Sequence, residues 1–503
     1  MTTDVRADES IAADDAATAT ALGQYVATQT GASNIVVTGF SRLTGGAIQD
    51  NYALTLECTG GSHSGTQRLV VRSDAPSQVA ASLTRAQEFH VLRAAFQAGV
   101  TVPEPLWLCE DASIIGAPFC IMTWVPGTAS GRQLVRTIST PEQARHLVQQ
   151  LGEQLARLHR IAPPNDSLPF LQLPQRAPAL ARVSQYRHWL DAIPRKHPVL
   201  EWALNWLKDH APDSGLRSLC HGDFRTGNYM VHEGRVSAVL DWEFASWGDP
   251  FEDLGWLCAR SWRFGAPERE VGGIGDKADL YEAWERATGW NVDDKQVCYW
   301  EVMGMVRWAI IALQQGLRHL TGEQTSLELA LTGRMLPEIE FDILCRIDEI
   351  EGRTTPAASS DAGESANDTH AFSAPDGSNL LDTARSTLLN TLLPQLPREF
   401  AYEALMVANA MATARRELLD AGTSASATAR ATREFIAKLE FSASGAAAAS
   451  NTAEIEGLER ELAQLLRSRA VSDTHAGPLR ELLFAQTRAR LKLSNPKYLT
   501  GRP

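Results

Sequence analysis

The chain has 503 residues, more than one hydrophobic core usually serves, so at least two domains are expected. Hydrophobic residues make up 44% and charged residues 21%, which excludes a largely disordered or fibrous protein. The formal net charge of -13 argues against a nucleic-acid partner, because binding to a phosphate backbone is driven by a surplus of Lys and Arg. A small-molecule partner is expected instead.

The seven cysteines are scattered and include no C-x-x-C pair, so reduced thiols are expected and a disulfide framework or zinc site is not. The N-terminus lacks a positive start followed by an apolar stretch, so no signal peptide is predicted. No apolar run approaches the length of a membrane span. These features predict a cytoplasmic protein with no membrane partner.

The first part of the chain predicts a small lobe of mixed structure. Residues 1–22 are polar and alanine-rich, as in a flexible lead or a short helix. Residues 23–126 then alternate short β-rich runs with glycine and serine clusters and one stretch of helical periodicity, Ser82 to Gln97. The expected strands, which we take to be antiparallel, are 34–40, 51–57, 68–72 and 117–125.

The next part, residues 127–351, predicts a helical second lobe. Thr140 and Gln143 can form a capping box, with Pro141 in the first turn of the helix that follows. A long helix is expected from Asp293 to about Leu320, with apolar residues at helical spacing. The chain up to this point is therefore an α+β protein with a small β lobe and a helical lobe.

The last part predicts a linker followed by helices. Residues 352–378 are rich in Ser, Ala, Pro, Gly and Asp with a single aromatic, so they cannot bury enough surface to order themselves. Residues 379–495 give four or five helical stretches and predict an all-α bundle. This bundle has no apparent chemistry, and we expect it to bind a protein partner or to self-associate.

The segment HGDFRTGN at residues 221–228 is the strongest chemical signal. Two short apolar runs follow it and flank His232-Glu233-Gly234-Arg235, a plausible hairpin turn. Folding this hairpin brings Asn228 and Asp241 to the same end. An amide oxygen and a carboxylate would converge there, and such hard oxygen ligands, with nucleotide phosphates, usually hold Mg²⁺. Asp223 is then well placed to accept the proton of an attacking hydroxyl.

This pattern, H-x-D-x-x-x-x-N with an Asp after a short hairpin, resembles the aminoglycoside phosphotransferase and choline kinase superfamily. The resemblance covers roughly residues 25–350 and implies a two-lobed protein-kinase-like fold that uses ATP and Mg²⁺. It makes Asp223 the catalytic base, Asn228 and Asp241 the Mg²⁺ ligands, and His221 a support for the loop.

A kinase-like fold also needs a cation on its third strand, usually a Lys paired with a Glu of the next helix. No lysine precedes Lys196, so the expected cation is Arg72, with Glu88 as its partner. Arginine keeps the charge but differs from lysine in reach and geometry. The alternative is that Arg72 is a surface residue at the end of a strand.

The resemblance suggests further nucleotide contacts. Gly45 and Gly46 fall where a loop covers the phosphates, although an ordinary β-turn explains them nearly as well. Residues 122–125 fall at the interlobe hinge, where Thr123 and Val125 would meet adenine through their backbone. Arg225 either contacts the transferred phosphoryl group or only decorates the loop.

Residues downstream of the hairpin are more ambiguous. Asp249 fits a helix cap, and we prefer a structural role for it and for Asp253. Glu243 is either close to the metal ligands or a substrate contact. Trp256, Trp262 and Arg263 border the acceptor pocket or serve only in packing.

Within the superfamily, the segments GAPFCIMTWVPG and GDPFEDLGWL look most like kinase domains fused to acyl-CoA dehydrogenases. This branch implies transfer of the ATP γ-phosphoryl group to a hydroxyl of a small molecule, such as a hydroxyacyl-CoA. The alternatives are an aminoglycoside, choline or sugar kinase, or a catalytically silent nucleotide-binding scaffold, which the Arg in place of Lys would suit. The C-terminal region resembles a domain of unknown function appended to such kinases.

Overall fold

The computed structural model describes residues 13–43, 49–74, 82–357, 377–439 and 452–500. The chain divides into two compact units. Unit 1 contains residues 1–178 and 213–297, and unit 2 contains residues 179–212 and 298–503. Both units are therefore discontinuous in sequence.

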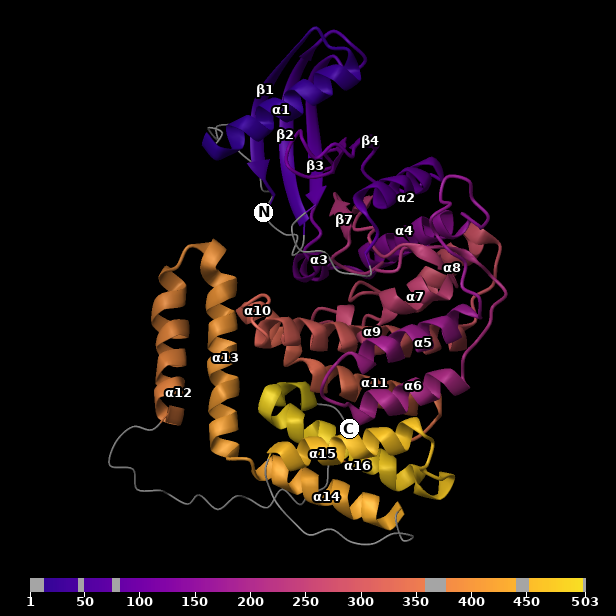
Figure 1. Ribbon diagram of the computed structural model, residues 1–503, viewed down its shortest axis with the longest axis vertical. Coiled ribbons are helices and arrows are strands. Elements are labelled where there is room, and N and C mark those ends of the chain that lie inside the picture. The colour runs from indigo at the N-terminus through magenta and orange to yellow at the C-terminus, as the bar shows by residue number, and fades with distance from the viewer. Residues whose placement is uncertain (1–12, 44–48, 75–81, 358–376, 440–451, 501–503) are drawn as a thin grey trace. The chain divides into compact units, whose positions relative to one another are not determined.

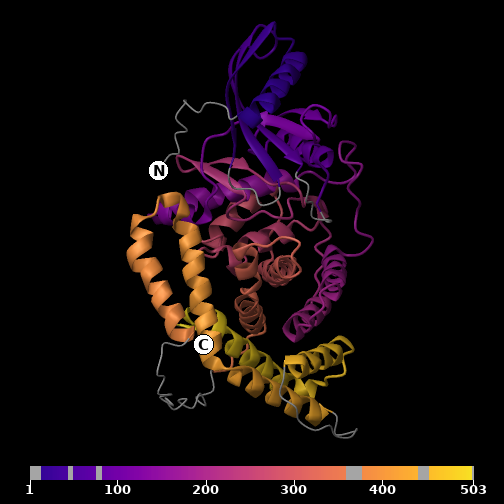
Figure 2. The same ribbon diagram turned by 60° about the vertical axis from the view of Figure 1, so that its left-hand side comes forward.

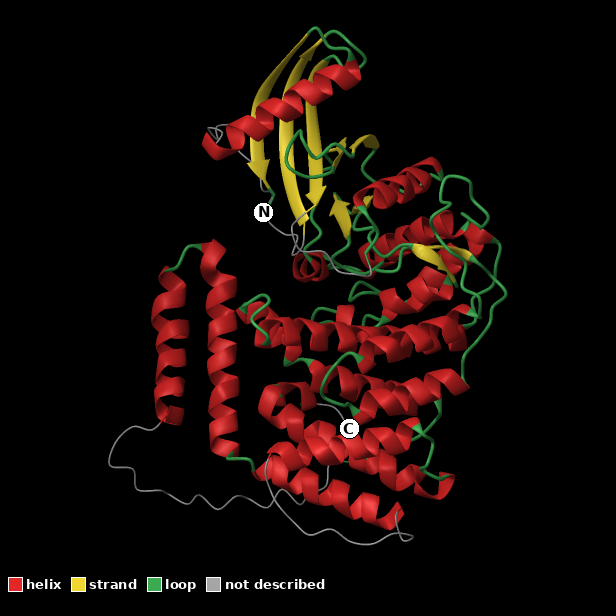
Figure 3. Ribbon diagram, in the orientation of Figure 1, coloured by secondary structure: helices red, strands yellow, loops and turns green. Residues whose placement is uncertain are grey.

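Unit 1 contains a five-stranded antiparallel sheet with the order β1-β2-β3-β5-β4. Helix α1 (Ala13–Thr30) lies across this sheet (Figures 1 and 3). Its Leu22 and Val26 are buried in one core with Leu69 and Val71 of β3. The strands are β1 (Asn34–Arg42), β2 (Gln49–Thr59), β3 (Gly65–Asp74), β4 (Pro105–Cys109) and β5 (Phe119–Thr123).

The alternation of side chains along β3 determines which face of the sheet carries Arg72. Leu69 and Val71 face the core with α1, so Arg72, which pairs in register with Cys120 of β5, lies on the other face. Helix α2 (Arg85–Gln97) follows β3 and begins with a capping box between Thr84 and Gln87. The alternation therefore directs Arg72 away from α1.

The sequence-based elements of this lobe differ from the structure in three ways. Residues 13–22, expected as a flexible lead or short helix, belong to α1, because Ala19 and Leu22 supply apolar surface to the sheet. Strand β4 was not predicted, since PLWLC has no clear alternation. Helix α2 begins at Arg85, three residues after the expected start.

The rest of unit 1 holds short strands and helices around the HGDFRTGN segment. The expected capping box of Thr140 and Gln143 is present at the start of α4. Gly152 lets α4 approach α8, because a Cβ there would lie 2.8 Å from the carbonyl oxygen of Leu280. The elements are α3 (Gly131–Thr137), α4 (Pro141–His159), β6 (Ser218–Cys220), β7 (Tyr229–His232), β8 (Arg235–Val239), β9 (Ser246–Gly248), α7 (Phe251–Cys258), a 3-10 turn (Arg260–Trp262) and α8 (Lys277–Thr288).

Unit 2 is helical. Its longest helix, α9 (Asp294–Leu320), matches the long helix expected from Asp293. The other helices are α5 (Pro178–Asp191), α6 (Pro198–Asp209), α10 (Leu327–Gly333), α11 (Leu336–Ile350), α12 (Gly377–Thr387), α13 (Ala401–Asp420), α14 (Thr423–Leu439), α15 (Thr452–Arg467) and α16 (Ala476–Ser494). Short helical turns cover Leu388–Leu392, Leu393–Gln395, Arg398–Phe400, Asp473–His475 and Pro496–Leu499.

The main core of unit 2 joins helices from distant parts of the chain. Val199 of α6 and Phe341 of α11 are buried in one cluster with Leu462 of α15 and Phe484 of α16. Arg480 of α16 also makes a two-pronged ion pair with the buried Asp348 of α11, at 2.6 and 2.7 Å. The C-terminal helices α14–α16 therefore share a core with α6 and α11.

Within the described residues, none of the helices combines the length and the apolar character needed to span a bilayer.

Candidate active site

The HGDFRTGN segment forms a loop between β6 and β7, and a buried carboxylate holds its first turn. Asp253 of α7 accepts backbone hydrogen bonds from His221 at 2.7 Å and from Gly222 at 2.9 Å. Gly222 has a φ of 76°, and a Cβ there would collide with the carbonyl oxygen of Phe244. Only glycine fits this turn without strain.

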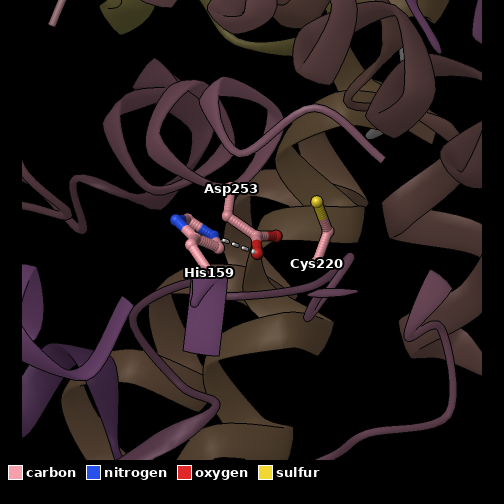
Figure 4. Close-up of side chains that lie close together, drawn as sticks. All are labelled: His159, Cys220 and Asp253. Carbon is pink, nitrogen blue, oxygen red and sulfur yellow. Dashed lines mark hydrogen bonds and ion pairs between the residues drawn. The ribbon is translucent and has the colours of Figure 1, made fainter. Parts of the chain in front are cut away.

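Asp253 is itself positioned by His159 of α4 (Figure 4). The Nε2–H of His159 donates to Oδ2 of Asp253 at 3.1 Å, and its Nδ1 accepts from Nε1 of Trp284 at 3.0 Å. Burial would raise the pKa of Asp253, but the hydrogen bond and charge of His159 and the contacts with His221 lower it. The hydrogen-bonded chain of Trp284, His159 and Asp253 thus supports the first turn of the loop.

His159, Cys220 and Asp253 offer ligand atoms within 4.8 Å of one another (Figure 4). Both ring nitrogens of His159 and both carboxylate oxygens of Asp253 already take part in hydrogen bonds. The thiol of Cys220 donates to the carbonyl oxygen of Asp249 at 3.3 Å. We therefore assign this cluster to support of the loop and not to metal binding.

Asp223 lies in the same loop and is held by three side chains. Trp256 Nε1 donates to Oδ1 at 2.8 Å, and Asn228 Nδ2 donates to Oδ2 at 2.5 Å. Arg225 Nε lies 3.3 Å from Oδ1, and its guanidinium stacks 4.5 Å from the ring centre of Trp262. The carboxylate of Asp223 is thus fixed and largely desolvated.

His221 connects the loop to the end of β8. Its Nε2–H donates to the carbonyl oxygen of Leu240 at 2.9 Å, and its Nδ1 accepts from the backbone N–H of Asp223 at 3.1 Å. Burial lowers the pKa of His221 despite the nearby Asp253 and Asp223 carboxylates. This arrangement gives the ring a structural place beside Asp223.

The hairpin expected between Asn228 and Asp241 is formed by β7 and β8, with His232 opposite Arg235. Glu233 and Gly234 have φ values of 48° and 75°, as a tight two-residue turn requires. The backbone N–H of Leu240 donates to the carbonyl oxygen of Asn228 at 2.8 Å. The hairpin therefore brings the backbone of Asn228 next to that of Asp241.

The two side chains are suited to a cation. Because Asn228 donates its Nδ2 to Asp223, its amide oxygen is the atom that it can offer to a metal. Burial alone would raise the pKa of Asp241. The guanidinium of Arg72 beside it acts in the opposite direction, and the pKa lies below its ordinary value, so the carboxylate is ionised. Asp241 also has a φ of 67°, in the left-handed region that non-glycine residues rarely occupy.

Arg72 of β3 reaches this site. Its Nη2 lies 2.7 Å from Oδ1 of Asp241, and its Nη1 lies 3.1 Å from Oε1 of Glu88 on α2. Arg85 holds the other oxygen of Glu88 at 2.6 Å. Arg72, Glu88 and Asp241 line a cavity together with Met122 and Val239.

Glu243 lies two residues beyond Asp241. Its Oε2 accepts from the hydroxyl of Ser82 at 3.0 Å, and its carbonyl oxygen accepts from the N–H of Leu83. Burial and the Asp241 charge raise the pKa of Glu243 to about 7. Glu243 therefore ties the end of the hairpin to the segment before α2.

The structure also places the other residues that the sequence predicts to contact the nucleotide. Thr123 ends β5, and its N–H donates to the carbonyl oxygen of Glu104 at 3.0 Å. Val125 follows two residues later, outside any strand. Gly45 and Gly46 lie outside the described residues.

The comparison with protein families decides the assignment. The model of the phosphotransferase enzyme family, APH, matches residues 39–290, which contain the loop, the hairpin and Arg72. The chain belongs to this phosphotransferase family. A second model, a domain of unknown function (DUF6285), matches residues 394–498.

Curated relatives of this APH-family protein include large multidomain proteins. Acyl-CoA dehydrogenase family member 10 of Mus musculus is 29% identical over 276 residues, which are 51% of this chain and 25% of the relative. Acyl-CoA dehydrogenase family member 11 of Gallus gallus is 38% identical over 180 residues, 33% of this chain and 22% of the relative. The chain thus spans about a quarter of the length of the curated relatives it matches.

A solved structure supports the fold of the phosphotransferase. A protein from Ralstonia eutropha, provisionally assigned as an aminoglycoside phosphotransferase, superposes with a TM-score of 0.54 at 22% identity, covering 66% of this chain and 98% of that one. Together with the five-stranded antiparallel sheet and the helices that follow, this likeness confirms the expected kinase-like fold with a C-terminal helical region.

The structure gives contacts to residues near α7 whose roles the sequence left ambiguous. Asp249 caps α7 as expected, since its Oδ1 accepts from the N–H of Phe251 at 3.0 Å, although the helix begins after Pro250. Asp253 has the structural role that was preferred for it, but its partners are the backbone N–H groups of the HGDFRTGN loop. Trp256, expected at the acceptor pocket or in packing, binds Asp223. No spacing in the sequence indicates these contacts, because each joins α7 to residues about 30 positions away.

Proposed function

We propose that the protein transfers the γ-phosphoryl group of ATP to a hydroxyl group of a small molecule. The observation that supports this most is the convergence of Asp223, Asn228, Asp241 and Arg72 within unit 1. Asn228 donates to Asp223, and Arg72 lies 2.7 Å from Asp241. A base, two oxygen ligands and a cation are the parts that phosphoryl transfer needs.

Asp223 would act on the acceptor. The acceptor oxygen attacks the γ-phosphorus, its proton passes to the Asp223 carboxylate, the bond to the bridging oxygen breaks, and ADP leaves. Trp256 and Asn228 each hold one carboxylate oxygen, which fixes the plane of the base. This prior positioning is a large part of what the protein contributes to such a reaction.

The amide oxygen of Asn228 and the carboxylate of Asp241 fit a magnesium ion, because both are hard oxygen donors and Asp241 is ionised. When bound, Mg²⁺ would neutralise charge on the nucleotide phosphates. Arg72 would bind the same phosphates, with Glu88 keeping its guanidinium in place. Thr123 and Val125 would meet adenine through their backbone.

For the acceptor we propose a hydroxyacyl-CoA. Support comes from the similarity to acyl-CoA dehydrogenase family members. Arg225, stacked on Trp262 beside Asp223, is available to the transferred phosphoryl group. None of the seven cysteines, all within the described residues, forms a disulfide, which fits a cytoplasmic reaction.

The test is phosphate transfer from Mg-ATP to a panel of hydroxyacyl-CoA esters, aminoglycosides, choline and sugars, read by mass spectrometry. We expect a phosphorylated CoA ester, and a rate at least about 100-fold lower for Asp223→Asn. Asp249→Asn, a change at a buried carboxylate that caps α7 and binds the Ser214 hydroxyl, is the matched control. Nucleotide binding without transfer to any acceptor or metabolite extract would instead indicate a silent scaffold.

A further inference from the structure

Helices α12 and α13 of unit 2 form a hairpin that exposes an unusual number of large apolar side chains. Among the described residues, 15 such side chains are exposed, and seven of them are Leu or Phe of this hairpin. Their exposed fractions run from 37% at Leu396 to 60% at Leu380. The buried residues of the hairpin are small or polar: Ser378, Ala404, Ala408 and Thr413. Other large apolar side chains of the hairpin, such as Leu381 and Met406, are only partly buried.

The two helices lie side by side in both views of the protein (Figures 1 and 2). They run antiparallel, because a Cβ at Gly377, where α12 begins, would lie 3.5 Å from Leu418 near the end of α13. The exposed residues therefore gather at opposite ends of the hairpin. The base cluster is Leu380, Leu418 and Leu419, and the tip cluster is Leu392, Leu396, Phe400 and Leu405.

We propose that the hairpin is the docking surface for a second copy of this chain. Two hairpins pair antiparallel across a two-fold axis, so that the tip cluster of each copy covers the base cluster of the other. An interface of this kind is self-complementary, and each contact occurs twice. The four helices then enclose an apolar seam like that of a four-helix bundle.

The exposed area fits such a pairing. Seven half-exposed Leu and Phe side chains offer on the order of 600 Å² per copy, close to the roughly 800 Å² that each partner contributes to a standard stable interface. Residues 358–376 of the same chain include one large apolar residue, Phe372, too few to cover both clusters. A second copy has both a tip cluster and a base cluster, so it can cover both clusters of the first copy.

The charges on the hairpin favour this occupant over a membrane surface. Residues 377–420 contain five acidic residues and four arginines, with no lysine. A helix that lies on a membrane is usually rich in Lys and Arg on its polar face. A nearly balanced mixture of signs allows two copies to approach without net repulsion.

The test measures the mass of the full chain in solution by sedimentation and light scattering. We expect twice the chain mass of 54.9 kDa for the wild type. Leu405→Glu in the tip and Leu419→Glu in the base should each weaken the dimer at least about tenfold. Leu173→Glu, at an equally exposed leucine in unit 1, is the matched control and should remain dimeric.

A mixing experiment tests the tip-to-base arrangement itself. Leu405→Glu protein combined with Leu419→Arg protein should form a mixed dimer. In that dimer, the glutamate in the tip cluster of one copy meets the arginine in the base cluster of the other. Restoration of dimers supports the proposal, because tip-to-tip pairing would not bring the glutamate and the arginine together. A monomeric wild type, or a dimer that survives both leucine substitutions, overturns it. Leu405→Ala and Leu419→Ala keep the helix and separate loss of the interface from loss of the fold.

Discussion

Arg72 lies 2.7 Å from Asp241 through Nη2 and 3.1 Å from Glu88 through Nη1. One planar guanidinium therefore joins α2 to the end of the β7–β8 hairpin. A lysine ammonium is a single point of charge and cannot reproduce both directions at once. The arginine in this position thus links strand β3 and helix α2 to Asp241 at the end of the hairpin.

We expect Arg72→Met to lower kcat/KM for ATP by roughly 10²–10³-fold, because a donor to the phosphates is lost. Arg72→Lys keeps the charge and should cost only about tenfold. The melting temperature of Arg72→Met should fall by only a few degrees, since Arg85 still pairs with Glu88 at 2.6 Å and the Asp241 side chain, 34% exposed, can be solvated by water. Steady-state kinetics and thermal unfolding of both variants check this.

Arg85→Met is the matched control, because Arg85 pairs with the same Glu88, is more buried than Arg72 (3% against 15% of the side chain exposed) and also pairs with Asp74, at 2.9 Å. It should cost about 3–5 kcal/mol of folding free energy, since two carboxylates lose a buried partner. Its kcat/KM for ATP should change less than that of Arg72→Met. The opposite order would show that Arg72 serves only to hold α2.

Asp253→Asn should lower kcat by about 100-fold or more while the dissociation constant for ATP changes little. The Asn amide group would face a backbone N–H that now donates to a carboxylate, so the turn at His221 and Gly222 must shift. Asp223 would move with it, whereas Arg72 on β3 would not. Single-turnover kinetics and calorimetric titration with ATP separate the two effects.

Asp249→Asn serves as the control for that change. Asp249 is also fully buried, but it only caps α7 and binds the Ser214 hydroxyl at 2.7 Å. Its loss should cost about 1 kcal/mol of stability and leave kcat nearly unchanged. Equal losses of kcat in the two variants would contradict the special place given to Asp253.

The hairpin and the strand that places Arg72 could be predicted because their signals are local. Alternating side chains define β3, and Glu233-Gly234 between apolar runs defines the turn. The support of Asp223 could not be predicted in this way. Trp256 and Asp253 reach the loop from α7, and their sequence pattern equally fits a packed helix, so only the tertiary fold distinguishes the two interpretations.

The C-terminal region shows the same limit on a larger scale. Its helical periodicity is clear in the sequence. The pattern of each amphipathic helix, however, indicates only that the helix has an apolar face. Which helix covers that face depends on contacts such as Phe341 with Phe484, whose ring centres lie 5.9 Å apart across 143 positions of sequence. Helical periodicity holds no information about such a pairing.

The stability of unit 2 should fall in acid because of His197. Burial and the nearby Arg490 lower the pKa of this histidine from 6.5 to about 3. The unfolded chain therefore binds a proton that the folded chain does not, so stability is full above pH 6.5 and is lost as the pH falls toward 3. The loss should approach about 1.4 kcal/mol per pH unit below that point.

His197→Gln isolates this effect. Glu340, whose pKa is raised by burial, acts in the opposite sense, so only the difference between wild type and variant reports on His197. Urea unfolding at pH 7.5, 6.5 and 5.5 should show that difference shifting in favour of the variant by about 1 kcal/mol at the lowest pH. A difference independent of pH would contradict the assignment.

Removal of residues 358–503 should destabilise what remains. Val199 and Phe341 would lose the partners that bury them, and a stretch of apolar surface on α6 and α11 would face water. We expect aggregation or strong binding of a hydrophobic dye by the fragment. In the full chain, Phe484→Ala should cost about 3–5 kcal/mol by denaturant unfolding, which tests the same core without truncation.

The core shared by α6, α11 and α16 also constrains the order of events during synthesis. Val199 leaves the ribosome long before Leu491, although both belong to one cluster of buried residues. Unit 2 cannot close until nearly the whole chain has been made, whereas the last segment of unit 1 is complete at residue 297. At typical rates of synthesis of about 5–20 residues per second, α6 waits on the order of 15–60 s for its partners. A growing chain of this protein therefore exposes the apolar surface of α6 and α11 to water throughout that interval.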